Sequence, residues 1–119
     1  MYSPQLLEHF EHPRNVGELT RPDAEATIDN PACGDVMTLQ LRIEDGRIAE
    51  AKYRVKGCAA AIACGSALTE LIAQRSLAEA RALRREQIVS AVGGLPPASA
   101  HASHLAFDAL QAALQKLPQ

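Results

Sequence analysis

The clearest pattern in the chain is an alternation of apolar and polar residues on both sides of an Asp-Gly pair. The apolar members are Met37, Leu39, Leu41, Ile43, Ala49, Ala51, Tyr53 and Val55. Such alternation is typical of strands with one buried face, and Asp45-Gly46 between the two runs is a strong hairpin signal. We therefore expect an antiparallel hairpin with one solvated face, joined by a weaker strand over 24–29.

Apolar residues at helical spacing predict helices before and after this hairpin. A short helix is expected from Ser3 to Phe10, because Ser3 suits the N-cap, Pro4 suits the first turn and His12-Pro13 ends the pattern. After Gly57-Cys58 the spacing predicts an alanine-rich helix over 59–74. A capping box at 76–79 opens a further short helix, and another helical stretch is expected over 85–92.

Gly93-Gly94 and Pro96-Pro97 separate these segments from a last helix. That helix is expected from about Ser99 to Lys116, with a buried stripe at Leu105, Ala109, Leu110, Ala113, Leu114 and Leu117. Strands come first and helices follow, so we predict the α+β class, with a small three-stranded antiparallel sheet packed against several helices. The 119 residues are expected to form a single domain, 1–119.

Composition and charge mainly argue against classes of function, such as binding nucleic acid or spanning a membrane. Aromatic residues make up only 3% of the chain, which argues against base stacking, and a net charge of −2 without a dense Lys/Arg run argues against nucleic acid as a partner. No apolar run reaches the roughly 18 residues of a membrane span, and residues 2–11 lack the core of a signal peptide. We therefore expect a cytoplasmic protein with reduced thiols. No pattern indicates a conventional hydrolase or nucleotide enzyme.

The first candidate for chemistry is Cys33-Gly34-Asp35, between the weak strand and the strong one. Glycine permits a tight turn, so the two flanking side chains can face a common centre. A thiolate and a carboxylate two residues apart are a reasonable half-site for zinc or iron. The alternative is a turn with a buried cysteine and a local hydrogen bond from Asp35.

Cys58 is the second candidate, because it stands between the returning strand and the alanine-rich helix. Cys33 precedes the outgoing strand, so a hairpin closing at Asp45-Gly46 brings both thiols to the same edge of the sheet. Its place near a helix N-terminus predicts a lowered pKa for the Cys58 thiol. The alternative is a small core residue at a strand–helix junction.

Among the remaining cysteine and histidines, only some are candidate metal ligands. Cys64 lies about 600° of helical rotation after Cys58 and is expected to be a buried apolar residue. His101 and His104 stand at i and i+3 on the last helix, followed by Asp108, so either histidine could reach a metal. We expect His104 to be exposed. His9 and His12 are expected on the surface, as are the arginines at 75, 81, 84 and 85.

Several motifs then occur in one consistent order. They are Tyr2-Ser3, His12-Pro13-Arg14-Asn15-Val16-Gly17, Pro31-Ala32-Cys33-Gly34-Asp35-Val36-Met37, Gly57-Cys58, and Leu95-Pro96-Pro97 before a histidine and a Ser-x-Leu-Ala-x-Asp-Ala-Leu helix. Over nearly its whole length the chain resembles the IscU/NifU-type iron–sulfur cluster assembly scaffold proteins, the NifU-like N-terminal domain family. The resemblance implies a SufE/NifU-like fold and a monomer or weak homodimer without enzymatic activity.

The resemblance also implies a cargo and partners. A transient [2Fe–2S] cluster or iron, with zinc as an alternative occupant, would be held by Cys33, Asp35, Cys58 and His101. Sulfur would come from a cysteine desulfurase, and the cluster would pass to acceptor apo-proteins. An Hsp70-type chaperone would dock on Leu95-Pro96-Pro97, although the Val-Lys that follows in the family is here Ala98-Ser99.

One position departs from the family pattern. The third cysteine of the family falls at Ala102, which leaves two thiolates, a carboxylate and an imidazole. This set suits tetrahedral zinc well, whereas iron–sulfur clusters are mostly held by thiolates. The family's acceptor of persulfide sulfur is also missing. Two alternatives to a scaffold therefore remain: a zinc-binding relative that regulates a desulfurase without assembling clusters, and a thiol or persulfide carrier using Cys33 and Cys58.

Overall fold

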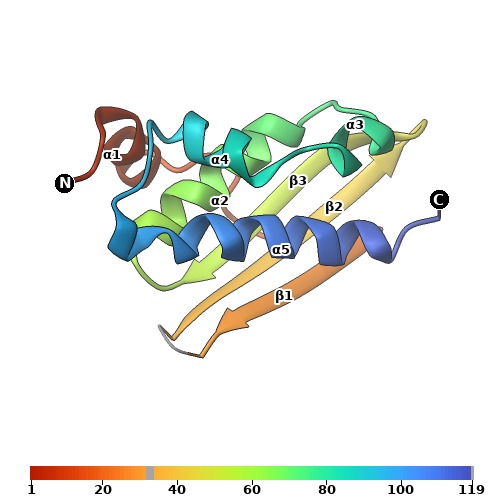
Figure 1. Ribbon diagram of the computed structural model, residues 1–119. Coiled ribbons are helices and arrows are strands. Elements are labelled where there is room, and N and C mark those ends of the chain that lie inside the picture. The colour runs from red at the N-terminus through yellow and green to blue at the C-terminus, as the bar shows by residue number, and fades with distance from the viewer. Residues whose placement is uncertain (32–33, 119) are drawn as a thin grey trace.

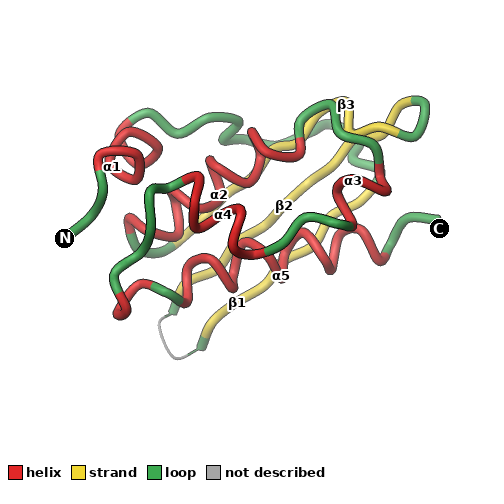
Figure 2. Tube along the Cα trace, turned by 45° about the horizontal axis from the view of Figure 1, so that its top comes forward, coloured by secondary structure: helices red, strands yellow, loops and turns green. Residues whose placement is uncertain are grey.

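The computed structural model describes residues 1–31 and 34–118, and its core element is a three-stranded antiparallel sheet with the order β1-β2-β3. The strands are β1 (Ala24–Asn30), β2 (Asp35–Glu44) and β3 (Arg47–Lys56). The helices are α1 (Pro4–Glu11), α2 (Ala59–Ile72), α3 (Leu77–Arg81), α4 (Arg85–Ala91) and α5 (His101–Gln115), with a 3-10 turn at Pro97–Ser99. The helices gather on one face of the sheet (Figures 1 and 2). The predicted α+β class is confirmed.

The hairpin forms where the sequence predicts it, with one irregularity. Asp45 and Gly46 both have positive φ, 53° and 73°, as a two-residue hairpin turn of type I′ requires. The register shifts between Arg42 and Ile43, and Ala49 is left without a partner as a β-bulge. Ile48 is consequently fully buried, whereas the alternation predicted Ala49 there.

The core lies between the sheet and helices α2 and α5. Tyr53 on β3 is 1% exposed, and its hydroxyl donates to the carbonyl oxygen of Ile62 on α2 at 2.8 Å. α2 approaches so closely here that a Cβ on Gly65 would lie 2.4 Å from Cε2 of Tyr53. The predicted stripe of α5 is buried along its whole length, and this helix packs on β1 and β2. These contacts hold α2 and α5 against the sheet.

The helix ends follow the predicted signals closely. The Ser3 hydroxyl caps α1 by accepting from the N–H of Leu6, and Ser76 with Glu79 forms the expected capping box at α3. The apolar stripe predicted for α1 is only partly right, because Leu6 is buried while Leu7 and Phe10 are 41% and 39% exposed. Among the described residues, no helix is long and apolar enough to cross a membrane.

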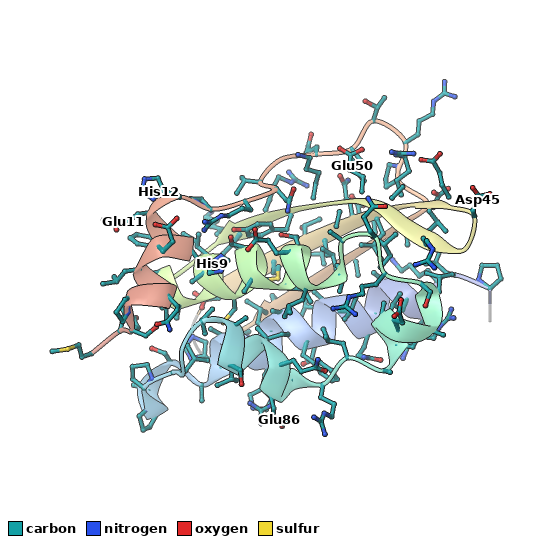
Figure 3. The ribbon with its side chains drawn as sticks, turned by 90° about the horizontal axis from the view of Figure 1, so that it is seen from above. His9, Glu11, His12, Asp45, Glu50 and Glu86 are labelled. Carbon is teal, nitrogen blue, oxygen red and sulfur yellow. The ribbon has the colours of Figure 1, made fainter. Side chains whose placement is uncertain are left out.

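The expected surface position of His9 is wrong. Its side chain is only 12% exposed, and Nδ1 lies 2.7 Å from the hydroxyl of the fully buried Ser66 on α2. Nε2 lies 3.7 Å from Oε1 of Glu70. Burial, and secondarily the Arg14 charge, lower the pKa of His9. His12, 73% exposed, lies at the outer end of α1 as predicted (Figure 3).

Candidate metal centre

The candidate centre lies at the end of the sheet where β2 begins and β3 ends. Asp35 is the first residue of β2, and Cys58 follows β3 by two residues and stands at the N-cap of α2. The pairing of Val36 with Lys56 brings these two positions together, as the hairpin argument predicts for this edge of the sheet. His101, the first residue of α5, completes the group. Cys33, the remaining predicted ligand, lies outside the described residues.

Three side-chain atoms converge in this centre. Oδ2 of Asp35 lies 3.2 Å from Sγ of Cys58 and 3.1 Å from Nε2 of His101, and Sγ lies 3.7 Å from Nε2. Oδ1 of Asp35 accepts from the backbone N–H of Cys58 at 3.2 Å. The carboxylate is nearly buried, with 5% of its side chain exposed, while 23% of the His101 side chain is exposed. The group is thus fixed on one side and open on the other.

These distances can be compared with the edges of a metal's coordination polyhedron. Tetrahedral zinc with bonds of about 2.0–2.3 Å to N, O and S separates its ligand atoms by about 3.3–3.6 Å. The three separations observed here, 3.1, 3.2 and 3.7 Å, are close to that range. A thiolate, an imidazole and a carboxylate also form a donor set that zinc and iron accept. The three residues are therefore spaced much as the ligands of one metal ion would be.

The predicted acidity of Cys58 is wrong in direction. Burial raises the pKa of its thiol, and the neighbouring Asp35 carboxylate raises it further. The backbone N–H groups of Ala60 and Ala61 at the start of α2 act in the opposite sense, as expected for a helix N-terminus, but they do not prevail. In the absence of a cation, the thiol therefore keeps its proton and donates a hydrogen bond to Oδ2 of Asp35. A bound cation would take the place of that proton.

The other candidate ligands lie outside this group. Cys64 is fully buried and burial raises its pKa to about 12, so it is the inert core residue that its position in α2 predicts. His104 is exposed and lines, with His101 and Asp108, a cavity of about 140 Å³ between β1 and α5. It does not belong to the converging group of described residues. Ala102 is fully buried.

Sequence reasoning missed the role of Arg85, which it assigned to a solvated face. Nη1 of Arg85 donates to the hydroxyl of Ser103 at 3.2 Å, and Ser103 is fully buried in the first turn of α5. Arg85 therefore ties α4 to the turn that carries His101. The only available signal was its place at the start of a short helix, which does not reveal such a contact.

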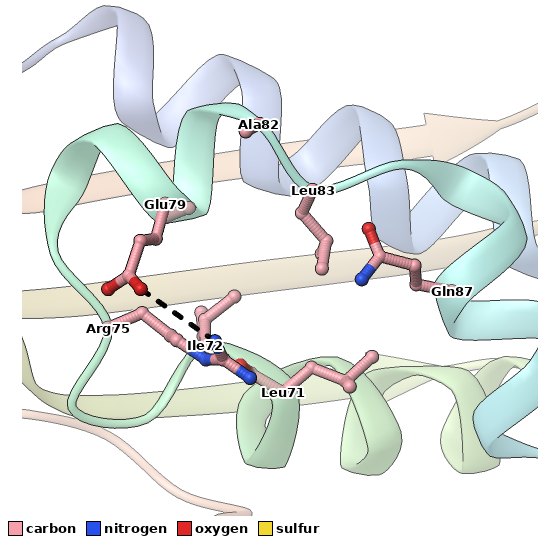
Figure 4. Close-up of a pocket in the computed structure, with 8 residues that line it drawn as sticks. Leu71, Ile72, Arg75, Glu79, Ala82, Leu83 and Gln87 are labelled. Atoms are coloured by element: carbon pink, nitrogen blue, oxygen red, sulfur yellow. Dashed lines mark hydrogen bonds and ion pairs between the residues drawn. The ribbon is translucent and has the colours of Figure 1, made fainter.

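A second cavity of about 220 Å³ lies between α2, α3 and α4 (Figure 4). Its apolar floor includes Leu71, Ile72 and Leu83, and the ion pair drawn across it joins Arg75 and Glu79 at 3.9 Å. No cysteine or histidine lines it among the described residues. The candidate centre at Cys58 lies at the other end of α2 from this cavity.

The chain is similar to known proteins over nearly all of its length. The sequence profile of the family described as "NifU-like N terminal domain" matches residues 1–119. The chain is 43% identical over 114 residues to the iron-sulfur cluster assembly scaffold protein IscU 1 of Archaeoglobus fulgidus, covering 96% of this chain and 74% of that protein. It is 44% identical over 117 residues to the scaffold protein IscU of Haemophilus influenzae, covering 95% and 92%.

The fold is also found in a solved structure. The crystal structure of a NifU-like protein (N-terminal) from Brucella abortus superposes with a TM-score of 0.78 at 24% identity, covering 96% of this chain and 92% of that one. At this identity the likeness shows the fold alone. The predicted NifU-like architecture, in which a small antiparallel sheet carries helices on one face, is confirmed.

Proposed function

Because this chain belongs to the NifU-like N-terminal domain family, we propose that it is a scaffold on which iron and sulfur are assembled into a cluster and then passed on. The observation that carries the proposal is the convergence of Oδ2 of Asp35, Sγ of Cys58 and Nε2 of His101 within 4.8 Å of one another. The relatives named as cluster assembly scaffolds share more than two fifths of their aligned residues with this chain.

Each residue of the centre has a distinct role in this proposal. Cys58 supplies a thiolate, His101 an imidazole nitrogen, and Asp35 a carboxylate oxygen that also orients Cys58 through its backbone N–H. Cys33 supplies the second thiolate. Because Ala102 contributes none, the cargo, iron or a [2Fe–2S] cluster, is held by fewer thiolates than iron–sulfur clusters usually have. A cluster held in this way is released readily, which suits a protein that transfers it.

The proposed partners follow from the role. A cysteine desulfurase provides sulfur, and acceptor apo-proteins receive the cluster. An Hsp70-type chaperone binds at Leu95-Pro96-Pro97, where Pro96 is extended and Pro97 begins the 3-10 turn. The chain acts as a scaffold in this account, and catalysis belongs to the desulfurase.

Reconstitution of the full chain without oxygen tests the proposal. Ferrous iron, L-cysteine and a cysteine desulfurase are added, and visible absorption is followed. We expect a chromophore that Cys33→Ser and Cys58→Ser each abolish. Cys64→Ala is the matched control, because that thiol is fully buried and lies outside the centre. A folded wild-type protein that develops no chromophore would contradict the proposal.

A second function is favoured by the ligand separations, which match tetrahedral zinc. In that case the chain binds zinc permanently and regulates a desulfurase by forming a complex with it. It would retain about one zinc ion per chain on purification, and Cys58→Ser would release that ion. Desulfurase activity that is unchanged on mixing would exclude this function.

A further inference from the structure

The segment that leads into the metal centre is attached to the first residues of the chain. α4 ends at Ala91 and α5 begins at His101, so residues 92–100 carry His101 to its place. The hydroxyl of Ser3 donates to the carbonyl oxygen of Val92, at the start of this connection. The hydroxyls of Tyr2 and Ser99 lie 3.4 Å apart, near its end. In Figure 1 the connection descends beside the N-terminus before it enters α5.

The start of the connection is shaped to receive the N-terminal segment. Gly93 has a φ of 70°, and a Cβ there would lie 2.7 Å from Oγ of Ser3 and 2.5 Å from Oε1 of Gln5. Only glycine combines this backbone conformation with so close an approach. The end of α4 and the beginning of α1 are therefore fitted to each other.

The hydroxyl group of Ser3 makes hydrogen bonds to both α1 and the connection. Oγ of Ser3 accepts from the N–H of Leu6 at 2.9 Å, which caps α1, and donates its own hydrogen to Val92. Ser99 is 8% exposed and belongs to the 3-10 turn that stands two residues before His101. A shift of this turn would move His101 relative to Asp35 and Cys58, because α5 continues directly from it.

Beside these polar contacts, the N-terminal segment and the connection leave a space between them. A cavity of about 490 Å³ lies between residues 1–4 and 93–96. Tyr2 and Leu95 also pack against the core, but the hydroxyl contacts Ser3–Val92 and Tyr2–Ser99 are single polar contacts at the two ends of the connection. Contacts of this kind can open without unfolding the sheet.

We propose that Tyr2 and Ser3 are positioning residues for the metal centre. While their hydroxyls bond to the connection, Nε2 of His101 stays near Asp35 and Cys58. When these contacts break, His101 can move away from the other two residues, and the centre loses its metal faster. The inference rests on the proposed function in that the centre holds a metal.

The test compares two N-cap serines. Ser3→Ala and Ser76→Ala each remove a cap from a helix whose N-cap residue has φ −68° and ψ 160°. Both therefore lower stability in a similar way, but only Ser3 contacts the connection. The zinc-loaded full chain is mixed with an excess of a chromophoric chelator. We expect zinc release to be about threefold to tenfold faster in Ser3→Ala and Tyr2→Phe, and unchanged in Ser76→Ala.

A thermodynamic cycle and a metal-free measurement complete the test. The effects of Tyr2→Phe and Ser99→Ala on the rate of zinc release should not be additive, because each substitution removes the same hydroxyl contact. Amide hydrogen exchange of residues 99–103 without metal should quicken in Ser3→Ala and Tyr2→Phe but not in Ser76→Ala. Equal exchange in all three variants would overturn the inference. A wild-type chain that retains no zinc would instead count against the metal centre, while the exchange data would still decide this proposal.

Discussion

Gly57 lies against the carboxylate of Asp35 so closely that a Cβ on residue 57 would be 2.4 Å from Oδ1 and 2.6 Å from Cγ. The last residue before Cys58 therefore has no side chain because the carboxylate occupies its place. Asp35 can reach Sγ of Cys58 and Nε2 of His101 only because this space is free. The Gly-Cys pair of the sequence is thus a steric requirement of the centre as well as a turn.

This relationship predicts that Gly57→Ala impairs metal binding more than stability. The added methyl group should displace Asp35 and weaken zinc binding by about 10- to 100-fold, as changes to groups that orient metal ligands do. The free energy of unfolding should fall by about 1 kcal/mol, because the displaced carboxylate loses its hydrogen bond to the N–H of Cys58, although no positive φ is needed at residue 57. Zinc affinity from competition with a chelator and urea denaturation together measure both effects.

Gly65→Ala provides the contrasting control. Its Cβ would meet the Tyr53 ring at 2.4 Å inside the core, so it should lower the free energy of unfolding by about 1–3 kcal/mol. Zinc affinity of the folded protein should stay within a factor of about three. Equal effects of the two substitutions on zinc affinity would show that Gly57 has no special relation to the centre.

Metal affinity should rise with pH. Burial and Asp35 raise the pKa of the Cys58 thiol above its ordinary value, so at neutral pH the thiol carries a proton that a metal must displace. Below that pKa, each unit of pH should tighten zinc binding by about tenfold for this proton. Calorimetric titrations in buffers of different ionisation enthalpy count the protons released. Cys64→Ala should leave the slope unchanged, and a slope of zero in the wild type would show that Cys58 is not a ligand.

Adding a thiol at residue 102 should slow the loss of the cargo. Ala102→Cys restores the third cysteine of the family pattern, next to His101 on α5. With more thiolate ligation, a reconstituted cluster should persist longer than in the wild type when a chelator is added. The half-life of visible absorption measures this. If Ala102→Cys and the wild type lose absorption at the same rate, the missing thiol does not account for cluster lability.

His9 should make the fold less stable in mild acid. Its pKa is lowered mainly by burial, so the folded state binds fewer protons than the unfolded state near the ordinary pKa of about 6.5. The free energy of unfolding should therefore decrease as pH falls through this value and below it. His9→Gln should remove that decrease, whereas His12→Gln should keep it, because His12 is 73% exposed. Urea midpoints between neutral pH and mild acid measure the difference.

The sequence predicts the local structure well wherever short-range chemistry decides it. Asp45-Gly46 can adopt positive φ at both positions, and Ser76 with Glu79 caps its own helix, so neither depends on distant residues. The bulge at Ala49 was not predicted, because alternation alone does not reveal one extra residue in a strand. Because of this bulge, Ile48 is buried where the alternation of apolar and polar residues predicts Ala49 to be buried.

The centre was partly predictable for a similar reason. Hairpin pairing places Asp35 beside Cys58, whereas the arrival of His101 depends on how α5 packs on β1 and β2, which only the family resemblance indicated. The burial of His9 against Ser66 also depends on packing between segments distant in sequence. The acidity of Cys58 was mispredicted because the helix N-terminus was considered without burial and the adjacent carboxylate.

We propose that Asp35, Cys58 and His101 together hold a metal or cluster. The most direct measurement is metal analysis with optical spectra on the full-length protein isolated without oxygen, alongside Cys58→Ser and His101→Ala. We expect iron with visible charge-transfer absorption, or about one zinc ion per chain, in the wild type and a loss of that metal in both variants. A folded wild-type protein free of metal, or variants that retain the same metal content, would contradict it.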